Sequence, residues 1–277
     1  MPELPEVETI KEAMQKAVCG AVIESVEVRQ RQLRQQIPVD LEKIITGAKI
    51  RRLYRVAKYA IMELDNGYSV VWHFGMSGKI KIVGTNTDVN LEKHDHVILK
   101  TNLGNLIYND PRRFGLVTLI ESDKFNLHPL FAHLGVDPFD VQLTAAYLKE
   151  AFKNKRIPIK IALLDQSIIC GIGNIYASEA LYEARISPLR TCCSLQLKEI
   201  KNLIAAIKKT LAKAIQAGGS TLHDYRQPDG QTGYFQLQHA VYGKDGKKCP
   251  NCRCKKDHIL KIIQGGRSTY YCPCLQK

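Results

Sequence analysis

The 277-residue sequence predicts an α+β protein built from several domains. Three observations favour this fold class. A helical pattern opens the chain, strand patterns dominate from there to about residue 120, and helical patterns replace them up to two glycines at 218 and 219. The last 29 residues then hold five of the nine cysteines, which marks a small C-terminal module.

The opening helix is predicted to begin at Pro5, since proline suits the first helical position, and to stop at Gly20. Its apolar residues recur at helical spacing and form one stripe: Val7, Ile10, Met14 and Val18.

Two hairpins are predicted in the following hundred residues. "KYAIMEL" and "YSVVWHF" flank Asp65-Asn66-Gly67, which is a hairpin-turn sequence, and "HVILKT" and "LIYND" flank residues 102–105. These patterns indicate a β-sandwich or a barrel behind the first helix.

Helices are predicted after the linker "HLGVDPFD". Thr144 is suited to cap a helix that runs to about Lys155, "IKIALLDQ" forms a short segment, and another helix starts at Ile175. Ser194 is expected to cap a longer helix that Gly218 closes.

The charge of the chain suggests a polyanionic partner. Lys and Arg number 40 against 27 Asp and Glu, which gives a net charge of +13, and residues 244–277 alone carry nine basic and two acidic side chains. The alternative is that the charge serves solubility only. No apolar run approaches the roughly 20 residues of a membrane span, and the N-terminus lacks a signal-peptide pattern, so the expected compartment is the cytosol.

The opening "MPELPEVETI" is acidic although the chain is basic. If Met1 is removed, Pro2 becomes a secondary amine with a pKa near that of an ordinary α-amino group, about 8, and can attack an electrophilic carbon. Glu3 and Glu6 would then be proton-transfer groups beside this nucleophile. The plainer alternative is a tolerated N-terminal proline and glutamates that complement the helix dipole.

Two further motifs suit nucleic-acid binding. "CGIGNIYASEA" places glycines and Asn174 at a helix start, where backbone N–H groups bind phosphate, although a plain helix–helix turn would look the same. "NDPRRFGL" couples two arginines to an aromatic ring, as a wedge between bases requires, and a salt-bridged turn is its alternative.

Eight motifs in order resemble one family over essentially the whole chain. They are "MPELPEVETI", "KY", "HFGMSG", "EKHDHV", "DPRRFG", "LLDQ…GIGNIYASEAL", "GGSTL…DG…GYF…VYG" and "GGRSTYYCP". Together they resemble the bacterial formamidopyrimidine-DNA glycosylases. The related endonuclease VIII-type enzymes typically carry glycine where this chain has Leu4, which favours the oxidised-purine branch.

This resemblance implies a bifunctional base-excision-repair enzyme. It would remove 8-oxoguanine and formamidopyrimidines from duplex DNA through a proline Schiff base and then cut the strand by β,δ-elimination as an abasic-site lyase. It also implies a division into residues 1–134, a catalytic β-sandwich domain with its leading helix; 135–220, a helix-two-turn-helix DNA-binding domain; 221–240, a lesion-recognition loop and connector; and 241–277, a zinc-finger hairpin.

The family motifs imply roles for particular residues. Pro2 would attack C1′, Glu3 would act as the acid with support from Glu6, and the remaining catalytic residues would be Lys58 and Arg267. The expected DNA contacts are His73, His94, Arg112, Arg156, Lys160, Asn174 and Tyr242. The residues expected to fill the gap left by a flipped nucleotide are Met76, Arg112 and Phe114, with Arg112 facing the orphaned cytosine. Ser220 and Thr221 would begin the loop over the flipped base.

The cysteine module departs from the family spacing. Cys249 and Cys252 keep the first C-x2-C pair, but Cys272 and Cys274 form C-x-C. One structural zinc is expected on these four cysteines, with Cys254 as the other candidate for the fourth ligand.

Two other functions share some of these features. One is an oxidised-pyrimidine glycosylase, and the other is a non-catalytic zinc-binding architectural protein. The expected partner is double-stranded DNA with oxidised purines or abasic sites, bound by a monomer in the bacterial cytoplasm, at the nucleoid, without membrane association.

Overall fold

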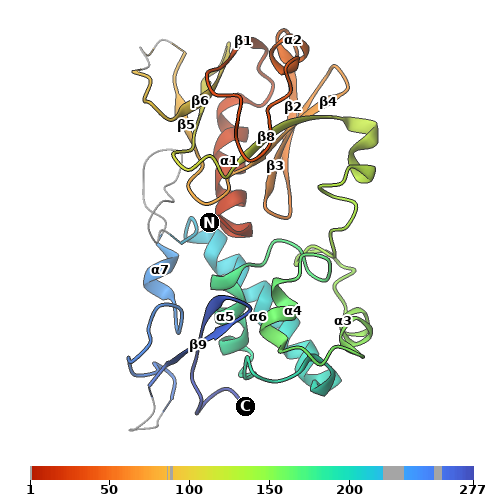
Figure 1. Cartoon of the computed structure of the whole chain (residues 1–277), viewed down its shortest axis with the longest axis vertical. Coiled ribbons are helices and arrows are strands. Elements are labelled where there is room, and N and C mark those ends of the chain that lie inside the picture. Colours follow the sequence, from red (N-terminus) through yellow and green to blue (C-terminus); the bar gives the residue numbers. More distant parts are fainter. Residues whose placement is uncertain (1, 86, 88–89, 221–233, 253–257) are drawn as a thin grey trace. The chain divides into compact units, whose positions relative to one another are not determined.

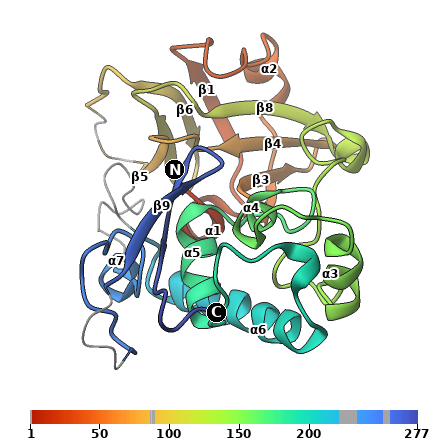
Figure 2. The same cartoon turned by 60° about the horizontal axis from the view of Figure 1, so that its bottom comes forward.

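A computed structural model describes residues 2–85, 87, 90–220, 234–252 and 258–277. The chain divides into two compact units, residues 1–132 with 217–236 and residues 133–216 with 237–277. Figures 1 and 2 show the first as strands around a helix and the second as helices with a hairpin. No helix among the described residues is both long and apolar enough to cross a membrane.

The first unit contains two antiparallel sheets within the described residues, ordered β1-β6-β7-β5 and β2-β3-β4-β8. Its elements are α1 (Leu4–Val18), β1 (Ile23–Val28), α2 (Leu41–Ile45), β2 (Ile50–Val56), β3 (Tyr59–Leu64), β4 (Tyr68–His73), β5 (Lys79–Val83), β6 (Asp95–Thr101), β7 (Asn105–Asn109), β8 (Leu116–Glu121) and the 3-10 helix η1 (Ser122–Leu127).

Both predicted hairpins are confirmed. β3 pairs with β4 across the turn at Gly67, whose φ of 85° is the left-handed conformation that this turn needs. β6 pairs with β7, with Leu99 opposite Leu106. The pattern allowed a sandwich or a barrel, and the described residues of the first unit form two separate sheets.

One hydrophobic core joins α1 to both sheets. The α1 stripe of Val7, Ile10, Met14 and Val18 is fully buried, and the core also contains Trp72 from β4 and Tyr108 from β7. The helix begins at Leu4, one residue before the predicted start, so proline occupies its second position, which also needs no N–H donor. Burial of α1 fixes the N-terminal residues that precede it.

The second unit is helical. It contains α3 (Ala145–Phe152), α4 (Ile159–Leu164), α5 (Asn174–Glu183), the 3-10 turn η2 (Cys192–Ser194), α6 (Leu197–Gln216) and the hairpin β9 (Leu260–Gln264) and β10 (Arg267–Tyr271). The sequence passes from the first unit to the second within α7 (Phe235–Gln238). Thr144 caps α3 as predicted, by accepting the Tyr147 N–H at 3.1 Å, but α3 ends at Phe152 rather than at about Lys155.

The predicted start of the long helix is wrong. Ser194 lies in the 3-10 turn η2, and α6 begins at Leu197, where the Glu199 carboxylate accepts the Gln196 N–H at 2.8 Å. The end is confirmed, because the helix stops at Gln216 and Gly218 follows with φ 70°. Two short helices, α2 and α7, were not predicted.

Candidate active site and nucleic-acid interface

The N-terminal acidic edge is buried in the first unit. Pro2 is buried, and Glu3 and Glu6 are only 3% and 2% exposed. The Glu6 carboxylate accepts the Glu3 N–H through Oε2 at 2.8 Å and the Ser220 N–H through Oε1 at 2.8 Å. Residues from the two ends of this unit's sequence therefore meet at one carboxylate.

Gly219 permits this meeting. Its φ is +81°, and a Cβ atom added there would lie 2.9 Å from Glu6 Oε1. Any larger residue would push the carboxylate away from the Ser220 N–H. Thr221, the other residue predicted for this loop, lies outside the described residues.

Lys58 is close enough to His73 for its positive charge to act on the pKa of the His73 ring. Lys58 follows Ala57, which has a φ of 51°, in the turn between β2 and β3, and it is 8% exposed. Burial and the positive charges of Arg34 and Lys58 lower the pKa of His73 to about 4, against the opposing charge of Asp110. His73 Nδ1 accepts the Gly75 N–H at 3.1 Å, so the neutral ring keeps its proton on Nε2.

The three predicted wedge residues lie on two loops of the first unit. Met76 is 38% exposed and Phe114 is 48% exposed, and the Arg112 guanidinium stacks 4.9 Å from the Phe114 ring. The loops touch, since a Cβ atom on Gly75 would lie 2.4 Å from the Phe114 carbonyl carbon. An exposed cation and aromatic ring held together can enter a base stack as one body.

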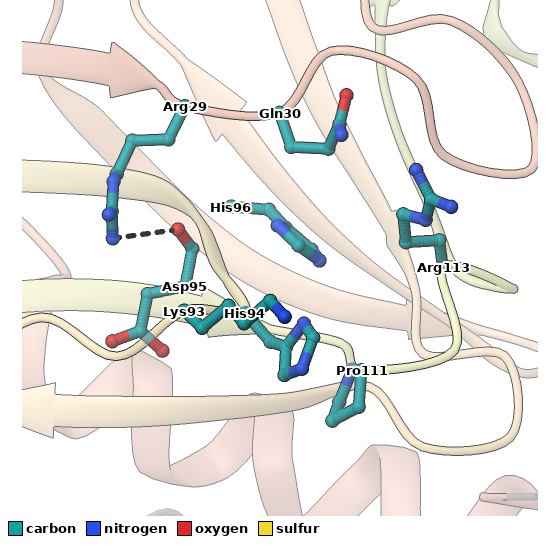
Figure 3. A pocket seen from close by; sticks show the side chains of 8 residues that line it. All are labelled: Arg29, Gln30, Lys93, His94, Asp95, His96, Pro111 and Arg113. Carbon is teal, nitrogen blue, oxygen red and sulfur yellow. Dashed lines mark hydrogen bonds between the residues drawn. The ribbon is translucent and has the colours of Figure 1, made fainter.

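His94 lines a basic pocket of about 460 Å³. Figure 3 shows its lining, which comes from the segment after β1, from the start of β6 with the residues before it, and from the loop after β7: Arg29, Gln30, Lys93, His94, Asp95, His96, Pro111 and Arg113. Three permanent cations and one carboxylate give it a positive charge that suits phosphate. The sequence analysis considered Arg113 only as part of the wedge motif and did not assign it to this pocket; its φ of 56° gives it a backbone conformation different from that of Arg112.

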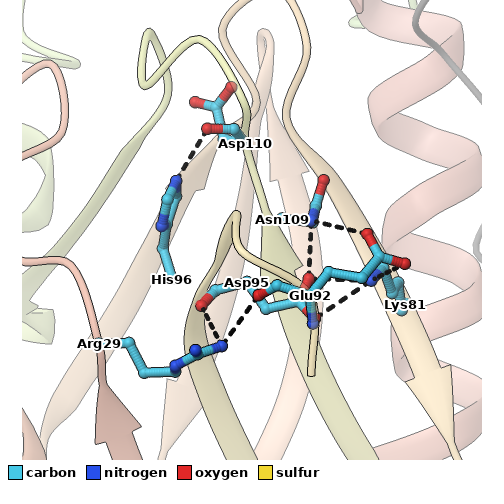
Figure 4. Close-up of polar contacts among 7 residues, drawn as sticks. All are labelled: Arg29, Lys81, Glu92, Asp95, His96, Asn109 and Asp110. Atoms are coloured by element: carbon cyan, nitrogen blue, oxygen red, sulfur yellow. Dashed lines mark hydrogen bonds and ion pairs between the residues drawn. The ribbon is translucent and has the colours of Figure 1, made fainter. Parts of the chain in front are cut away.

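A polar network around the buried Asp95 carboxylate supports this pocket (Figure 4). The Asp95 carboxylate accepts hydrogen bonds from Lys81 Nζ at 2.9 Å, Asn109 Nδ2 at 2.7 Å and the Glu92 N–H at 2.8 Å. Arg29 donates to the carbonyl oxygens of Glu92 and Asp95. Burial raises the pKa of Asp95, but these donors outweigh it and hold the pKa below its usual range. Lys93 and His94 are thereby fixed between two anchored residues.

In the second unit, Asn174 forms hydrogen bonds to two other residues that were predicted to contact phosphate, Lys160 and Tyr242. It begins α5, its Oδ1 accepts Lys160 Nζ at 2.5 Å, and its Nδ2 donates to the Ser268 carbonyl at 2.9 Å and to the Tyr242 hydroxyl at 3.4 Å. Lys160 is fully buried, so in this conformation its contact with Asn174 orients the amide. Arg267 precedes Ser268 on β10 and is exposed.

Arg156, by contrast, lies on the exposed segment between α3 and α4. Sequence reasoning also missed Glu179 on α5, which is 5% exposed and accepts the backbone N–H groups of Ala240, Val241 and Tyr242 at 2.8, 3.0 and 2.8 Å. Burial raises the pKa of Glu179 although these three hydrogen bonds oppose it. Its presence in the "GIGNIYASEA" motif was the available signal.

The predicted metal ligands share one cluster of the second unit. Cys249 and Cys272 are buried there, Cys252 and Cys274 pack against it, and the Tyr182 hydroxyl lies 3.2 Å from Cys249 Sγ. Cys274 is in a disulfide bond, and no group of three or more side chains that could hold a metal ion occurs among the residues described above. Cys254 lies outside those residues.

Comparison with known proteins identifies the family. Residues 1–117 match the formamidopyrimidine-DNA glycosylase N-terminal domain, and residues 134–226 match the formamidopyrimidine-DNA glycosylase H2TH domain. The formamidopyrimidine-DNA glycosylase of Paracoccus denitrificans is 43% identical over 284 residues, with both chains fully covered.

Two solved structures of the Lactococcus lactis protein are also similar. One is a variant in complex with DNA that contains Fapy-dG, with a TM-score of 0.89, 34% identity and full coverage of both chains. The other is a complex with DNA containing an abasic site, with a TM-score of 0.88, 35% identity and coverage of 99% of this chain and 100% of the other. This chain, with its α+β fold, belongs to the formamidopyrimidine-DNA glycosylase family.

Proposed function

We propose that this chain excises oxidised purines, namely 8-oxoguanine and formamidopyrimidines, from duplex DNA and then cuts the strand by β,δ-elimination. As a member of its family it is a base-excision-repair DNA glycosylase and abasic-site lyase. The observation that carries the proposed mechanism is the buried edge at which Glu3 and Glu6 adjoin Pro2.

The chemistry begins at Pro2. After loss of Met1 its secondary amine attacks C1′ of the damaged nucleotide, the base leaves, and an iminium forms between the nitrogen and C1′. Glu3, which is the next residue, protonates the sugar ring oxygen as the ring opens, and Glu6 holds the Glu3 backbone in place. Lys58 transfers a proton and contacts phosphate, and Arg267 contacts phosphate and assists the second elimination.

Duplex DNA is the proposed partner because the basic surfaces match its phosphates. The Lactococcus relatives bind DNA with Fapy-dG or an abasic site. The proposed backbone contacts are His73, His94, Arg112, Arg113, Arg156, Asn174 and Tyr242, with Lys160 acting through Asn174. Because C1′ is inaccessible inside a stacked duplex, the nucleotide is flipped while Met76, Arg112 and Phe114 fill the gap. Ser220 and Thr221 belong to the loop over the flipped base.

One structural zinc is proposed for the C-terminal module. Cys249, Cys252 and Cys272 are proposed as three thiolate ligands because they share one cluster, although the described side chains do not form a group of three arranged to bind a metal. Cys274 fits as the fourth only when its disulfide is reduced. When bound, zinc would supply a cross-link that holds the hairpin bearing Arg267 and takes no part in the reaction.

We further propose that the protein acts as a monomer in the bacterial cytoplasm, on the DNA of the nucleoid. Leu4 favours the oxidised-purine branch over oxidised pyrimidines. A purely architectural DNA-binding role would not explain why two carboxylates, Glu3 and Glu6, are buried beside Pro2.

Trapping with borohydride tests this proposal. Wild-type protein should cross-link to duplex DNA with 8-oxoguanine opposite cytosine, whereas Pro2→Gly should not, and Glu3→Gln should bind the duplex without excising the base. Glu12→Gln is the matched control, because Glu12 is an exposed glutamate of the same helix. Full trapping by Pro2→Gly at a lysine would refute the mechanism. Excision of thymine glycol in preference to 8-oxoguanine would indicate the pyrimidine branch.

A further inference from the structure

Asp110 is a fully buried carboxylate between the two loops that carry the wedge. Its Oδ1 accepts the Ser77 hydroxyl at 2.6 Å, and its Oδ2 accepts the Gly115 N–H at 2.8 Å and the Tyr108 hydroxyl at 3.2 Å. Hydrogen bonds to a buried charged acceptor are stronger than those between neutral groups. These three donors tie the carboxylate to the 74–78 segment, to the 110–115 segment and to β7.

The backbone of Asp110 is held as well. Its N–H donates to the His94 carbonyl at 3.1 Å, and its carbonyl accepts the Arg113 N–H at 3.2 Å and His96 Nε2–H at 2.9 Å (Figure 4). Asp110 is therefore fixed at the rim of the sheet before the turn that contains Arg112 and Phe114 begins.

Ser77 extends the network to the wedge itself. Its hydroxyl donates to Asp110 and accepts the Arg112 N–H at 3.3 Å, and Ser77 directly follows Met76 in the chain. The Ser77 hydroxyl therefore connects the Asp110 carboxylate to the backbone of Arg112, and Ser77 itself holds the backbone next to Met76.

The packing around the network leaves little freedom for another arrangement. A Cβ atom on Gly115 would lie 1.7 Å from the Tyr108 hydroxyl oxygen. Burial, with the charge and hydrogen bond of Asp110, raises the pKa of Tyr108 well above its usual range, so the hydroxyl remains a donor to the carboxylate.

We infer that Asp110 is the positioning residue of the wedge, because its carboxylate holds the Met76 and Arg112–Phe114 loops in one fixed relationship. This inference rests on the proposed function, in which these three side chains fill the gap. Filling a gap in the base stack requires all three to arrive together, and prior fixing of the loops removes an entropy cost from the flipping step. Arg112 can then face the orphaned base in a defined position.

Asp110→Asn tests the inference because asparagine keeps the size of the side chain but turns one acceptor into a donor facing donors. The rate of 8-oxoguanine excision opposite cytosine, relative to adenine, should fall roughly tenfold or more, as the loss of a charged hydrogen bond predicts. Cleavage at an abasic site in single-stranded DNA should remain at the wild-type rate, since no stack has to be filled there. A general loss of structure would lower both activities together.

Two further variants keep the test decisive. Ser77→Ala removes only the link to Arg112 and should lower the cytosine preference by a smaller factor, even if Asp110→Asn does not fold. Adding Asp110→Asn to Arg112→Ala should lower the preference no further than Arg112→Ala alone, because both changes act through Arg112.

The outcomes separate this inference from the proposed function. If Arg112→Ala loses the cytosine preference while Asp110→Asn and Ser77→Ala retain it, the positioning role is wrong and the wedge stands. If Arg112→Ala also retains the preference for cytosine, then both the gap-filling role of Arg112 and the positioning role of Asp110 are wrong. Absence of any excision by the wild-type protein would overturn the proposed function itself.

Discussion

Glu6 and Ser220, 214 positions apart in the sequence, are joined by a hydrogen bond of 2.8 Å from the Ser220 N–H to the Glu6 carboxylate. The other oxygen of the same carboxylate accepts the Glu3 N–H. A single buried group thus joins the proposed catalytic acid to the residue at which the proposed lesion loop begins. A shift of either Glu3 or Ser220 will therefore change the position of the Glu6 carboxylate and, through it, the position of the other residue.

Glu6→Gln is expected to reduce base excision strongly while duplex affinity changes little. Glutamine has one acceptor oxygen for two N–H donors, so its amide N–H2 must face either Glu3 or Ser220. Leaving a buried donor unpaired costs roughly 1–3 kcal/mol. Single-turnover excision and equilibrium binding would measure the two effects. Glu12→Gln on the same helix is the control, and equal excision by both variants would contradict the bridging role.

Local sequence was sufficient to predict the hairpins, because their turn chemistry and strand alternation lie within about fifteen residues. It was insufficient at α6. Ser194 is a good capping residue but lies in a 3-10 turn, while the helix starts after Gln196, where Glu199 supplies the hydrogen bond. The five-residue helix α2 is too short to show a helical repeat.

The same distinction applies to the candidate site. Pro2, Glu3 and Glu6 are neighbours in sequence, so their grouping could be predicted from the helix that begins there. Asp110 and Glu179 also lie inside the quoted motifs, but their roles could not be predicted, since these depend on partners such as Ser77 and Tyr242, 33 and 63 positions away. The place of Arg113 in the pocket, rather than in the wedge, was not predicted for a local reason: its φ is positive, unlike that of Arg112, and a motif does not reveal φ.

Stability should fall as the pH drops from about 6.5 to 4, partly because of His73. Its pKa is about 4 in the folded protein, lowered by burial and by Arg34 and Lys58, against about 6.5 when unfolded. The unfolded chain therefore binds the proton first. The contribution of the neutral ring is complete above pH 6.5 and is lost through this window, up to roughly 3 kcal/mol. Urea titrations at pH 7 and pH 5 would measure the loss.

His73→Gln should reduce this pH dependence, since glutamine does not titrate. His239, whose pKa is also lowered to about 4 by burial and Lys244, should supply a further part of it in the second unit. An unchanged difference between pH 7 and pH 5 in His73→Gln would show that His73 is not a source of the effect.

Glu179→Gln should destabilise the protein and weaken DNA binding. The carboxylate accepts three backbone N–H groups, including that of Tyr242, and glutamine cannot satisfy them all. The expected loss in unfolding free energy is roughly 2–3 kcal/mol. Glu183→Gln is the matched control on α5, because Glu183 is exposed and pairs only at the surface with Lys209, which is worth under about 1 kcal/mol. Denaturation and abasic-site DNA affinity should separate the two variants.

Zinc content is expected to depend on reduction of Cys274. A cysteine binds zinc as a thiolate, and a sulfur in a disulfide cannot supply one, so the disulfide of Cys274 prevents this residue from acting as a ligand. Protein purified with reductant should therefore hold one zinc, and oxidised protein should hold less. Cys274→Ala should then lose both the metal and strand cleavage, because the hairpin with Arg267 depends on the cross-link.

If Cys254 is the fourth ligand, Cys254→Ala should have this effect and Cys274→Ala should be mild. Normal cleavage by fully reduced protein without zinc would defeat both versions, since the position of Arg267 would then need no metal.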